Sequence, residues 1–258
     1  MRIIIKKIKY RASARFWSAV KDQSKNKHIL EKFDIPQSIF DSIHSLPKKM
    51  PLYRKLPETQ KKIVRNIYNA FDKLWKKHQR EIDGVLRKLK TTDFKKGWLK
   101  KEIPKTTGID WPFQKIYIFP GILNWTRTSG NQICVAIRPK YIFKKAKFIP
   151  PLLIHELIHI NTWEIKFRKK LFYKRDSEEI ATALLTNKII RDMNAEFNMH
   201  IPDQEFATPY QKFVTPFVNL EKFIPQFEKI LNQSKSYKEL ILKVDHLLKK
   251  IKHKAYYT

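Results

Sequence analysis

Apolar residues recur at spacings of three and four along much of the first hundred positions, a pattern that predicts amphipathic helices. The longest such run follows Pro57, a residue that suits the first position of a helix. The apolar members of the run are separated by Lys and Arg, and they are Ile63, Ile67, Phe71, Leu74, Trp75, Ile82, Val85, Leu86 and Leu89. The pattern predicts a helix of about thirty residues with a break near Gly84, preceded by shorter helices around 13–20 and 36–44.

The pattern changes after Thr106. Residues 115–119 and 133–137 are β-branched or aromatic, and each segment is bounded by Pro or Gly, so both are expected to be strands. The Ser-Gly-Asn sequence at 129–131 predicts a turn between them. Helices are predicted to begin at Pro150, near Ser177 and near Lys238.

These elements predict an α+β protein that is predominantly helical. We expect a mostly helical N-terminal region, residues 1–105, and a region with strands and helices, residues 106–258. The length of 258 residues fits one large domain or two small ones, so the two regions are free to pack as one.

Composition narrows the class of protein. Hydrophobic residues make up 42% of the chain, which excludes an intrinsically disordered protein. The single cysteine, Cys134, excludes an intramolecular disulfide and is expected to be a buried apolar residue of a strand. No apolar run reaches the length of a secretory signal or a membrane-spanning helix. We therefore expect a cytoplasmic protein with no membrane partner, while the oligomeric state is left open.

The sharpest chemical feature is the sequence His155-Glu156-Leu157-Ile158-His159 inside the helix that begins at Pro150. Residues four apart lie on one face of a helix, so the two imidazoles can bind one Zn²⁺ together. Glu156 is rotated by about 100° around the helix axis, where its carboxylate can reach a metal-activated water. This pattern predicts a general base beside a zinc ion.

A catalytic zinc ion needs a third protein ligand, and two glutamates compete for that role. Both stand in the sequence Asp176-Ser177-Glu178-Glu179 at the start of the next helix. A helical projection places Glu178 on the side of the apolar residues that follow it and directs Glu179 toward solvent. Glu179 also stands three residues after Asp176, the spacing of an N-terminal capping box. The projection therefore favours Glu178 as the ligand and leaves Glu179 as the alternative.

The motif with its downstream glutamate resembles the gluzincin metallopeptidases. Their pattern is His-Glu-x-x-His followed by a glutamate on a second helix, and here the second part is Glu178-Glu179-Ile180-Ala181. The resemblance implies that His155, His159 and Glu178 bind one Zn²⁺ and that Glu156 is the general base.

The same resemblance implies a zincin-like catalytic region, in which a small twisted sheet lies over the motif helix. An edge strand of that sheet holds the substrate backbone by β-augmentation. The segment just before the motif helix is the candidate for this edge, with Ile133, Val135 and Ile137 as its residues.

The resemblance also implies a Tyr or His that stabilises the developing oxyanion. Three residues are candidates, Tyr173, His200 and Tyr210, and the sequence does not choose among them.

The first functional hypothesis is therefore a zinc-dependent peptidase acting on peptide or protein substrates. The alternative is a basic nucleic-acid-binding protein with a structural or vestigial zinc site. Its basis is the formal charge of +30 and the presence of Trp17, Trp75 and Trp98 among lysines. Only 12 of the 54 basic residues are arginine, and lysines occur in nearly every amphipathic segment. The charge is thus better read as a bias toward acidic substrates or partners.

Overall fold

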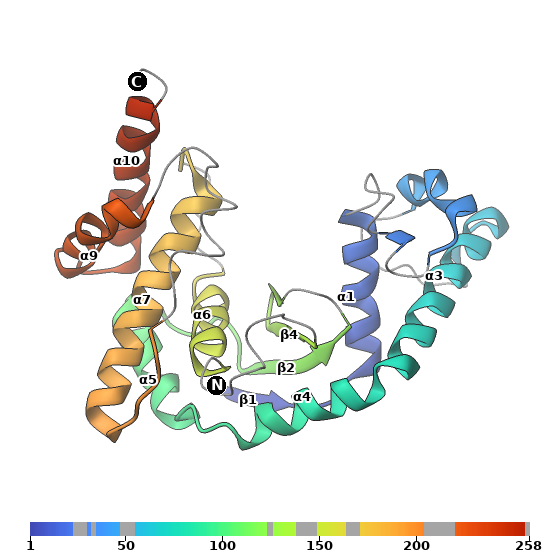
Figure 1. The fold of residues 1–258 in the computed structure, drawn as a ribbon, viewed down its shortest axis with the longest axis horizontal. Helices are drawn as coiled ribbons and strands as arrows, with labels where there is room; N and C mark the ends of the chain where they lie inside the picture. The colour runs from blue at the N-terminus through green and yellow to red at the C-terminus, as the bar shows by residue number, and fades with distance from the viewer. Residues whose placement is uncertain are drawn as a thin grey trace.

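The computed structural model shows a mostly helical protein with one small sheet (Figure 1). It describes residues 1–22, 30–31, 35–46, 55–122, 126–137, 149–163, 171–203 and 220–255. The strands among these residues are β1 (Arg2–Ile5), β2 (Lys115–Gly121), β3 (Arg127–Ser129) and β4 (Gln132–Ala136). The α-helices are α1 (Lys9–Asp22), α3 (Glu58–Lys77), α4 (Gln79–Thr91), α5 (Lys96–Thr107), α6 (Ile149–Asn161), α7 (Lys174–Phe197), α9 (Ile224–Asn232) and α10 (Tyr237–Ala255). Short 3₁₀ helices occur at η1 (Gln37–Ile39), η2 (Asp41–Ser45) and η6 (Leu220–Phe223). The expectation of a predominantly helical α+β protein is confirmed.

The sheet has the strand order β1-β2-β4-β3. β1 pairs with β2 in parallel, and β2 pairs with β4 in parallel. β3 runs antiparallel to β4, from which it is separated by the Gly130-Asn131 turn. Gly130 has a φ of 53°, a left-handed conformation that glycine adopts without a Cβ clash. Both predicted strands are present as β2 and β4, and a turn lies at the predicted residues but joins β3 to β4; β1 and β3 are not predicted by the sequence pattern.

The sheet joins both halves of the sequence. β1 comes from the first residues of the chain, and α1 and α4 pack against β2. The side chain of Arg15 in α1 donates hydrogen bonds to the Ser129 carbonyl oxygen at 3.1 Å and to Gln132 Oε1 at 3.3 Å. The division at residue 105 stays a prediction, but the N-terminal region supplies one strand of the sheet and holds the turn between β3 and β4.

The long N-terminal helix is interrupted at His78 and not near Gly84. His78 has φ −103° and ψ 20°, outside the helical region, and it separates α3 from α4. His78 is 6% exposed, and its Nδ1 atom lies 3.2 Å from Glu81 Oε1. Gly84 continues α4 because a glycine weakens a helix without forcing it to end.

The core of the N-terminal region is built from aromatic rings. Phe16 and Phe71 have ring centroids 5.6 Å apart, and Phe71 and Trp75 have centroids 5.5 Å apart. Trp17 is 1% exposed in the same cluster.

Within the described residues, no helix combines the length and apolar character needed to cross a bilayer.

Two glycines allow a test of the packing. A Cβ at Gly121 would overlap Cys134 Sγ, whereas a Cβ at Gly84 meets no atom within 4 Å. We expect Gly121→Ala to lower the free energy of unfolding by about 1–3 kcal/mol through overpacking. Gly84→Ala should raise it by about 0.5–1 kcal/mol, because alanine loses less backbone entropy in a helix. Urea unfolding followed by circular dichroism measures both, and a Gly121→Ala protein as stable as the wild type would contradict the packing around Cys134.

Candidate metal centre

Helix α6 carries the His155-Glu156-x-x-His159 motif through a buried part of the molecule. Pro150 and Pro151 stand in its first turn. Backbone amides in the first turn have no carbonyl acceptor within the helix, so the amide hydrogen that proline lacks is not needed there. His155 and Glu156 are buried, and His159 is partly buried. The two Nε2 atoms of His155 and His159 lie 3.0 Å apart, so both rings turn to the same point on one side of the helix.

Glu179 of α7 completes this cluster. Its Oε2 atom lies 3.2 Å from His155 Nε2 and 3.5 Å from His159 Nε2. The candidate ligand atoms of the three residues all lie within 4.8 Å of one another, so the group could hold a metal ion. Two imidazole nitrogens and one carboxylate oxygen, brought together from two packed helices, form the metal centre candidate.

Glu179, and not Glu178, therefore meets the histidines, so the preference for Glu178 is corrected. The helical projection assumed that α7 has one solvent side, but residues 180–187 are all buried. α7 packs against α6 and also against α10, so hydrophobicity around its axis does not identify the face that meets the histidines. The capping-box argument was wrong too, because α7 begins at Lys174 and Asp176 lies inside its first turn.

The environment of Glu179 acts on its ionisation in two directions. Burial opposes the charged form, but hydrogen bonds with His155 and His159 outweigh burial and hold the pKa of the carboxyl far below its ordinary value. A carboxylate that is ionised among imidazole nitrogens is in the protonation state that a metal ligand requires.

Glu156 faces the sheet. The Thr128 hydroxyl of β3 donates a hydrogen bond to Glu156 Oε2, and α6 packs against β3. The general-base candidate is thus held between its own helix and the strand at the margin of the sheet. Thr128 was not foreseen as a site residue, because β3 is short and lacks an apolar pattern.

Of the two edge strands, β1 and β3, the one that contacts the motif helix α6 is β3, so the expectation for Ile133, Val135 and Ile137 is corrected. Ile133 and Val135 belong to β4, which lies between β2 and β3, and Ile137 follows the end of β4. All three are buried. An apolar segment of this kind is typical of an interior strand, and the polar Arg127–Ser129 segment occupies the margin instead.

A remote carboxylate holds the start of α7. Asp245 of α10 accepts hydrogen bonds from the Phe172 amide at 3.0 Å, the Tyr173 amide at 2.8 Å and the Ser177 hydroxyl at 2.7 Å. Asp245 is 5% exposed. It lies on the apolar face of the last helix, with Ile241, Val244 and Leu248 at helical spacing. An acid at a core position is a sequence signal that could have identified it.

The three candidates for an oxyanion stabiliser have different outcomes. Tyr173 precedes the first residue of α7 and is partly buried, six residues before Glu179. His200 follows the other end of α7, and at 1.5 Å per residue the helix from Glu179 to Phe197 is about 27 Å long. That distance separates His200 from the metal centre candidate. Tyr210 lies outside the described residues.

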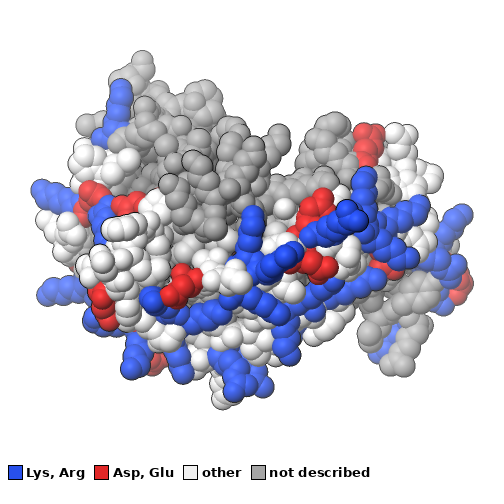
Figure 2. All heavy atoms as spheres, turned by 60° about the horizontal axis from the view of Figure 1, so that its bottom comes forward, with Lys and Arg blue, Asp and Glu red and all other residues white. Residues whose placement is uncertain are grey.

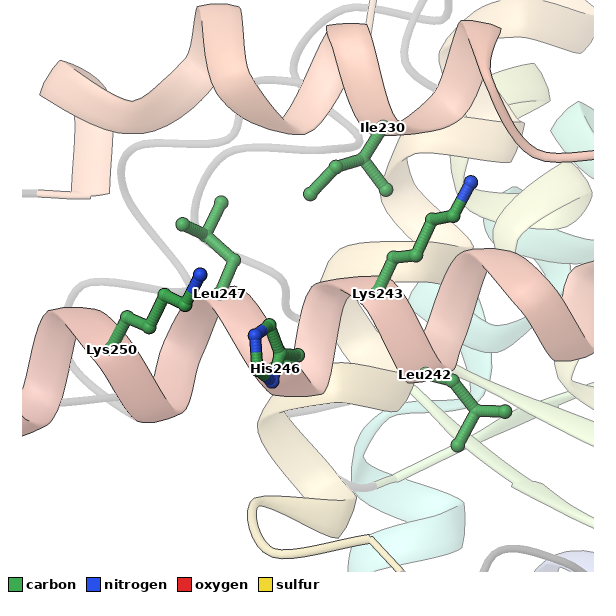
Figure 3. A pocket seen from close by; sticks show the side chains of 6 residues that line it. All are labelled: Ile230, Leu242, Lys243, His246, Leu247 and Lys250. Carbon is green, nitrogen blue, oxygen red and sulfur yellow. The ribbon is translucent and has the colours of Figure 1, made fainter.

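A separate hollow of about 390 Å³ lies between α9 and α10 (Figure 3). Ile230 projects from α9 toward α10, and Leu247 projects from α10 toward α9 (Figure 3). The residues that line the hollow are Ile230, Leu242, Lys243, His246, Leu247 and Lys250. None of them belongs to α6 or α7, so the hollow is not part of the metal centre candidate.

Comparison with models of protein families, with curated proteins and with solved structures finds no match. The case for function therefore depends on the geometry of the residues themselves.

The choice between the two glutamates is open to a direct test. We expect Glu179→Gln to weaken Zn²⁺ binding by more than about 100-fold, since the loss of a direct ligand exceeds the usual effect of an outer-shell change. Glu178→Gln removes the same charge one residue away and should leave the affinity nearly unchanged. Competition with a chromophoric chelator measures both dissociation constants. Equal affinities for the two variants, or a larger loss in Glu178→Gln, would contradict the arrangement.

Proposed function

We propose that the chain is a zinc-dependent peptidase in which His155, His159 and Glu179 bind one Zn²⁺ and Glu156 is the general base. The observation that carries the proposal is the convergence of the three ligand atoms beside a glutamate that belongs to the same helix as the histidines.

The distances within the cluster are compatible with a tetrahedral ion such as zinc. A tetrahedron with metal–ligand distances of about 2.0–2.1 Å has edges of about 3.3 Å. The three distances within the cluster are 3.0, 3.2 and 3.5 Å. Two histidines and one glutamate are also a known ligand set of catalytic zinc, one that leaves the fourth position for water or substrate.

In peptide hydrolysis the zinc ion and the residues of the chain have separate roles. Bound zinc supplies an activated water and polarises the scissile carbonyl. Glu156 accepts a proton from the attacking water and delivers it to the leaving amine, which restores the carboxylate for the next cycle. The Thr128 hydroxyl donates to Glu156 Oε2 and so restricts the rotation of the carboxylate.

The sheet supplies a means of holding an extended substrate. Among the described residues β3 pairs only with β4, and it contacts α6, so its other side is suited to pairing with a peptide. This arrangement fits a zincin-like region and the resemblance to gluzincins, with Glu179 in the ligand position. The charge of +30 favours peptides with acidic residues.

The peptidase hypothesis is tested by Glu156→Gln. We expect hydrolysis of a mixed peptide library, followed by mass spectrometry, to fall at least about 100-fold, because general-base catalysis contributes on that scale. The zinc content should stay at one per chain, since Glu156 is not a ligand. Glu58→Gln, at an exposed position in α3, is the control and should keep full activity. Wild-type protein that binds zinc but cleaves no peptide, or a fully active Glu156→Gln protein, would refute the proposal.

A second candidate function, binding of single-stranded nucleic acid, is favoured by one specific observation. Tyr10 is 67% exposed beside Arg11, whose guanidinium lies 5.6 Å from the centroid of that ring and 3.9 Å from the centroid of Tyr117. An exposed aromatic ring next to a stacked arginine can accept a base. Lys and Arg also form a band across the face shown in Figure 2. Exposed basic residues of the neighbouring β1 and α4 segments are Arg2, Lys6, Lys7, Lys9, Arg80, Arg87, Lys88 and Lys90.

The tryptophans that were expected to help bind nucleic acid do not contribute to this basic surface. Trp17 and Trp75 are buried in the aromatic core. Trp98 donates a hydrogen bond to Glu196 and packs edge-on against Phe197. The case for nucleic acid therefore depends on Tyr10, Arg11 and the basic side chains.

Charge-reversal variants distinguish a localised nucleic-acid-binding surface from an effect of the overall positive charge of the protein. If the band binds phosphates, Lys6→Glu with Lys90→Glu should weaken binding to a single-stranded oligonucleotide and reduce the slope of log affinity against log salt by about 2. Lys222→Glu with Lys229→Glu makes the same change in net charge on η6 and α9, and should have a smaller effect. Fluorescence anisotropy at several salt concentrations measures both pairs. The same loss in both pairs would exclude a localised surface.

A further inference from the structure

We infer that Asp245 is a positioning residue that couples the C-terminal helix α10 to the metal centre candidate, so that metal binding and the docking of α10 stabilise each other. The inference rests on the metal site of the proposed function, but it does not depend on peptidase activity.

Asp245 contacts the two residues that precede α7 and one residue of its first turn. Both carboxylate oxygens are used: Oδ2 accepts from the Phe172 amide, and Oδ1 accepts from the Tyr173 amide and the Ser177 hydroxyl. Phe172 and Tyr173 precede the first residue of α7, so their amides have no acceptor within the helix, and a carboxylate near a helix start also interacts favourably with the helix dipole. Asp245 therefore fixes the backbone that leads into α7 and, through Ser177, the first turn of the helix. The side chain of the N-cap residue, Tyr173, makes no capping hydrogen bond.

The same turns of α7 carry the third metal ligand. Ser177 and Glu179 are two residues apart, so their side chains leave the helix about 200° apart around its axis. Ser177 meets Asp245 of α10, and Glu179 meets His155 and His159 of α6. The start of α7 is thus held from opposite sides by α10 and by the histidines. A rotation or fraying of this turn moves the Glu179 carboxylate away from the histidines.

The burial of Ser177 and Asp245 strengthens the coupling between α10 and the metal centre candidate. Ser177 is fully buried and Asp245 is nearly so, and an unsatisfied polar group in such a place is strongly unfavourable. If Asp245 is removed, two backbone amides and a hydroxyl lose their partner at once, and the least unfavourable response is an opening of the first turn to water. Because linkage between binding and conformation is reciprocal, a metal ion that fixes Glu179 also favours the closed contact with α10.

The decisive experiment compares metal binding in wild-type protein, Asp245→Asn, Ser177→Ala and Arg191→Gln. Asp245→Asn keeps the shape of the side chain but replaces one acceptor oxygen with a donor group. Ser177→Ala removes a single hydrogen bond and provides the test if Asp245→Asn does not fold. Arg191→Gln is the control: Arg191 binds Asp203 and Glu228 and so joins the far part of α7 to α9.

We expect Asp245→Asn to weaken Zn²⁺ binding by about tenfold, the lower end of the range for residues that touch a metal ligand, because Asp245 acts on Glu179 through the backbone of α7. Ser177→Ala should shift the affinity in the same direction by less, and Arg191→Gln should not change it. The visible absorption spectrum of Co²⁺ bound to Asp245→Asn should differ from that of wild type, since the Glu179 oxygen no longer takes its position. In wild-type protein, added Zn²⁺ should slow amide hydrogen exchange in α10 as well as in α6 and α7.

Each outcome decides one question. An Asp245→Asn protein that is less stable but keeps the wild-type Zn²⁺ affinity and Co²⁺ spectrum shows a merely structural role and overturns the inference. Hydrogen exchange in α10 that is insensitive to Zn²⁺ also overturns it. Wild-type protein that binds no Zn²⁺ refutes the metal site and the inference together. Protein that binds Zn²⁺ in the expected order of affinities but cleaves no peptide refutes only the peptidase function.

Discussion

The packing of α6 against α7 is the constraint on which the candidate site depends. Each helix alone carries incomplete chemistry, with two imidazoles on one and a carboxylate on the other. Residues 180–187 of α7 are buried without interruption, so the helix cannot turn about its axis without disturbing contacts on every side. The position of Glu179 is therefore set by the core of the protein and not by a mobile loop. Precise placement of this kind is what a metal ligand requires.

Polar contacts fix α6 at its C-terminal end and at its middle. Near the C-terminal end, Asn161 is 1% exposed, accepts a hydrogen bond from the Thr107 hydroxyl at 2.7 Å and donates one to the Ile109 carbonyl oxygen at 2.8 Å. Toward the sheet, Glu156 accepts from Thr128. The motif helix is thus tied to α5 by an amide and to β3 by a carboxylate. Polar contacts orient this helix, while its apolar residues supply the stability.

The local pattern of the sequence was sufficient to predict the helices and the interior strands but not the third ligand or the edge strand. The histidine spacing, the apolar strands and the amphipathic helices are properties of neighbouring residues, and the helices and interior strands were accordingly predicted. Glu179 was not preferred over Glu178, because that choice depends on which neighbour covers each side of a helix that is buried all round. The three-residue polar strand β3 was not predicted for a related reason, since it acquires its role only from tertiary contacts. The place of Asp245 on an apolar helix face marks it as unusual, but its partner Ser177 lies 68 residues earlier and is identified only by the fold.

The parallel pairing of β1 with β2 has a consequence for how the chain folds. Ile3 pairs with Ile116 and Ile5 with Ile118, so the first strand has no partner until more than a hundred further residues have been synthesised. Pairing at such sequence separation is slow, because a long loop must close before the contacts form. During that interval three consecutive isoleucines are exposed on the nascent chain, and such a segment favours aggregation. Lys6, Lys7 and Lys9 follow them directly, and their mutual repulsion keeps two nascent chains from pairing at this segment.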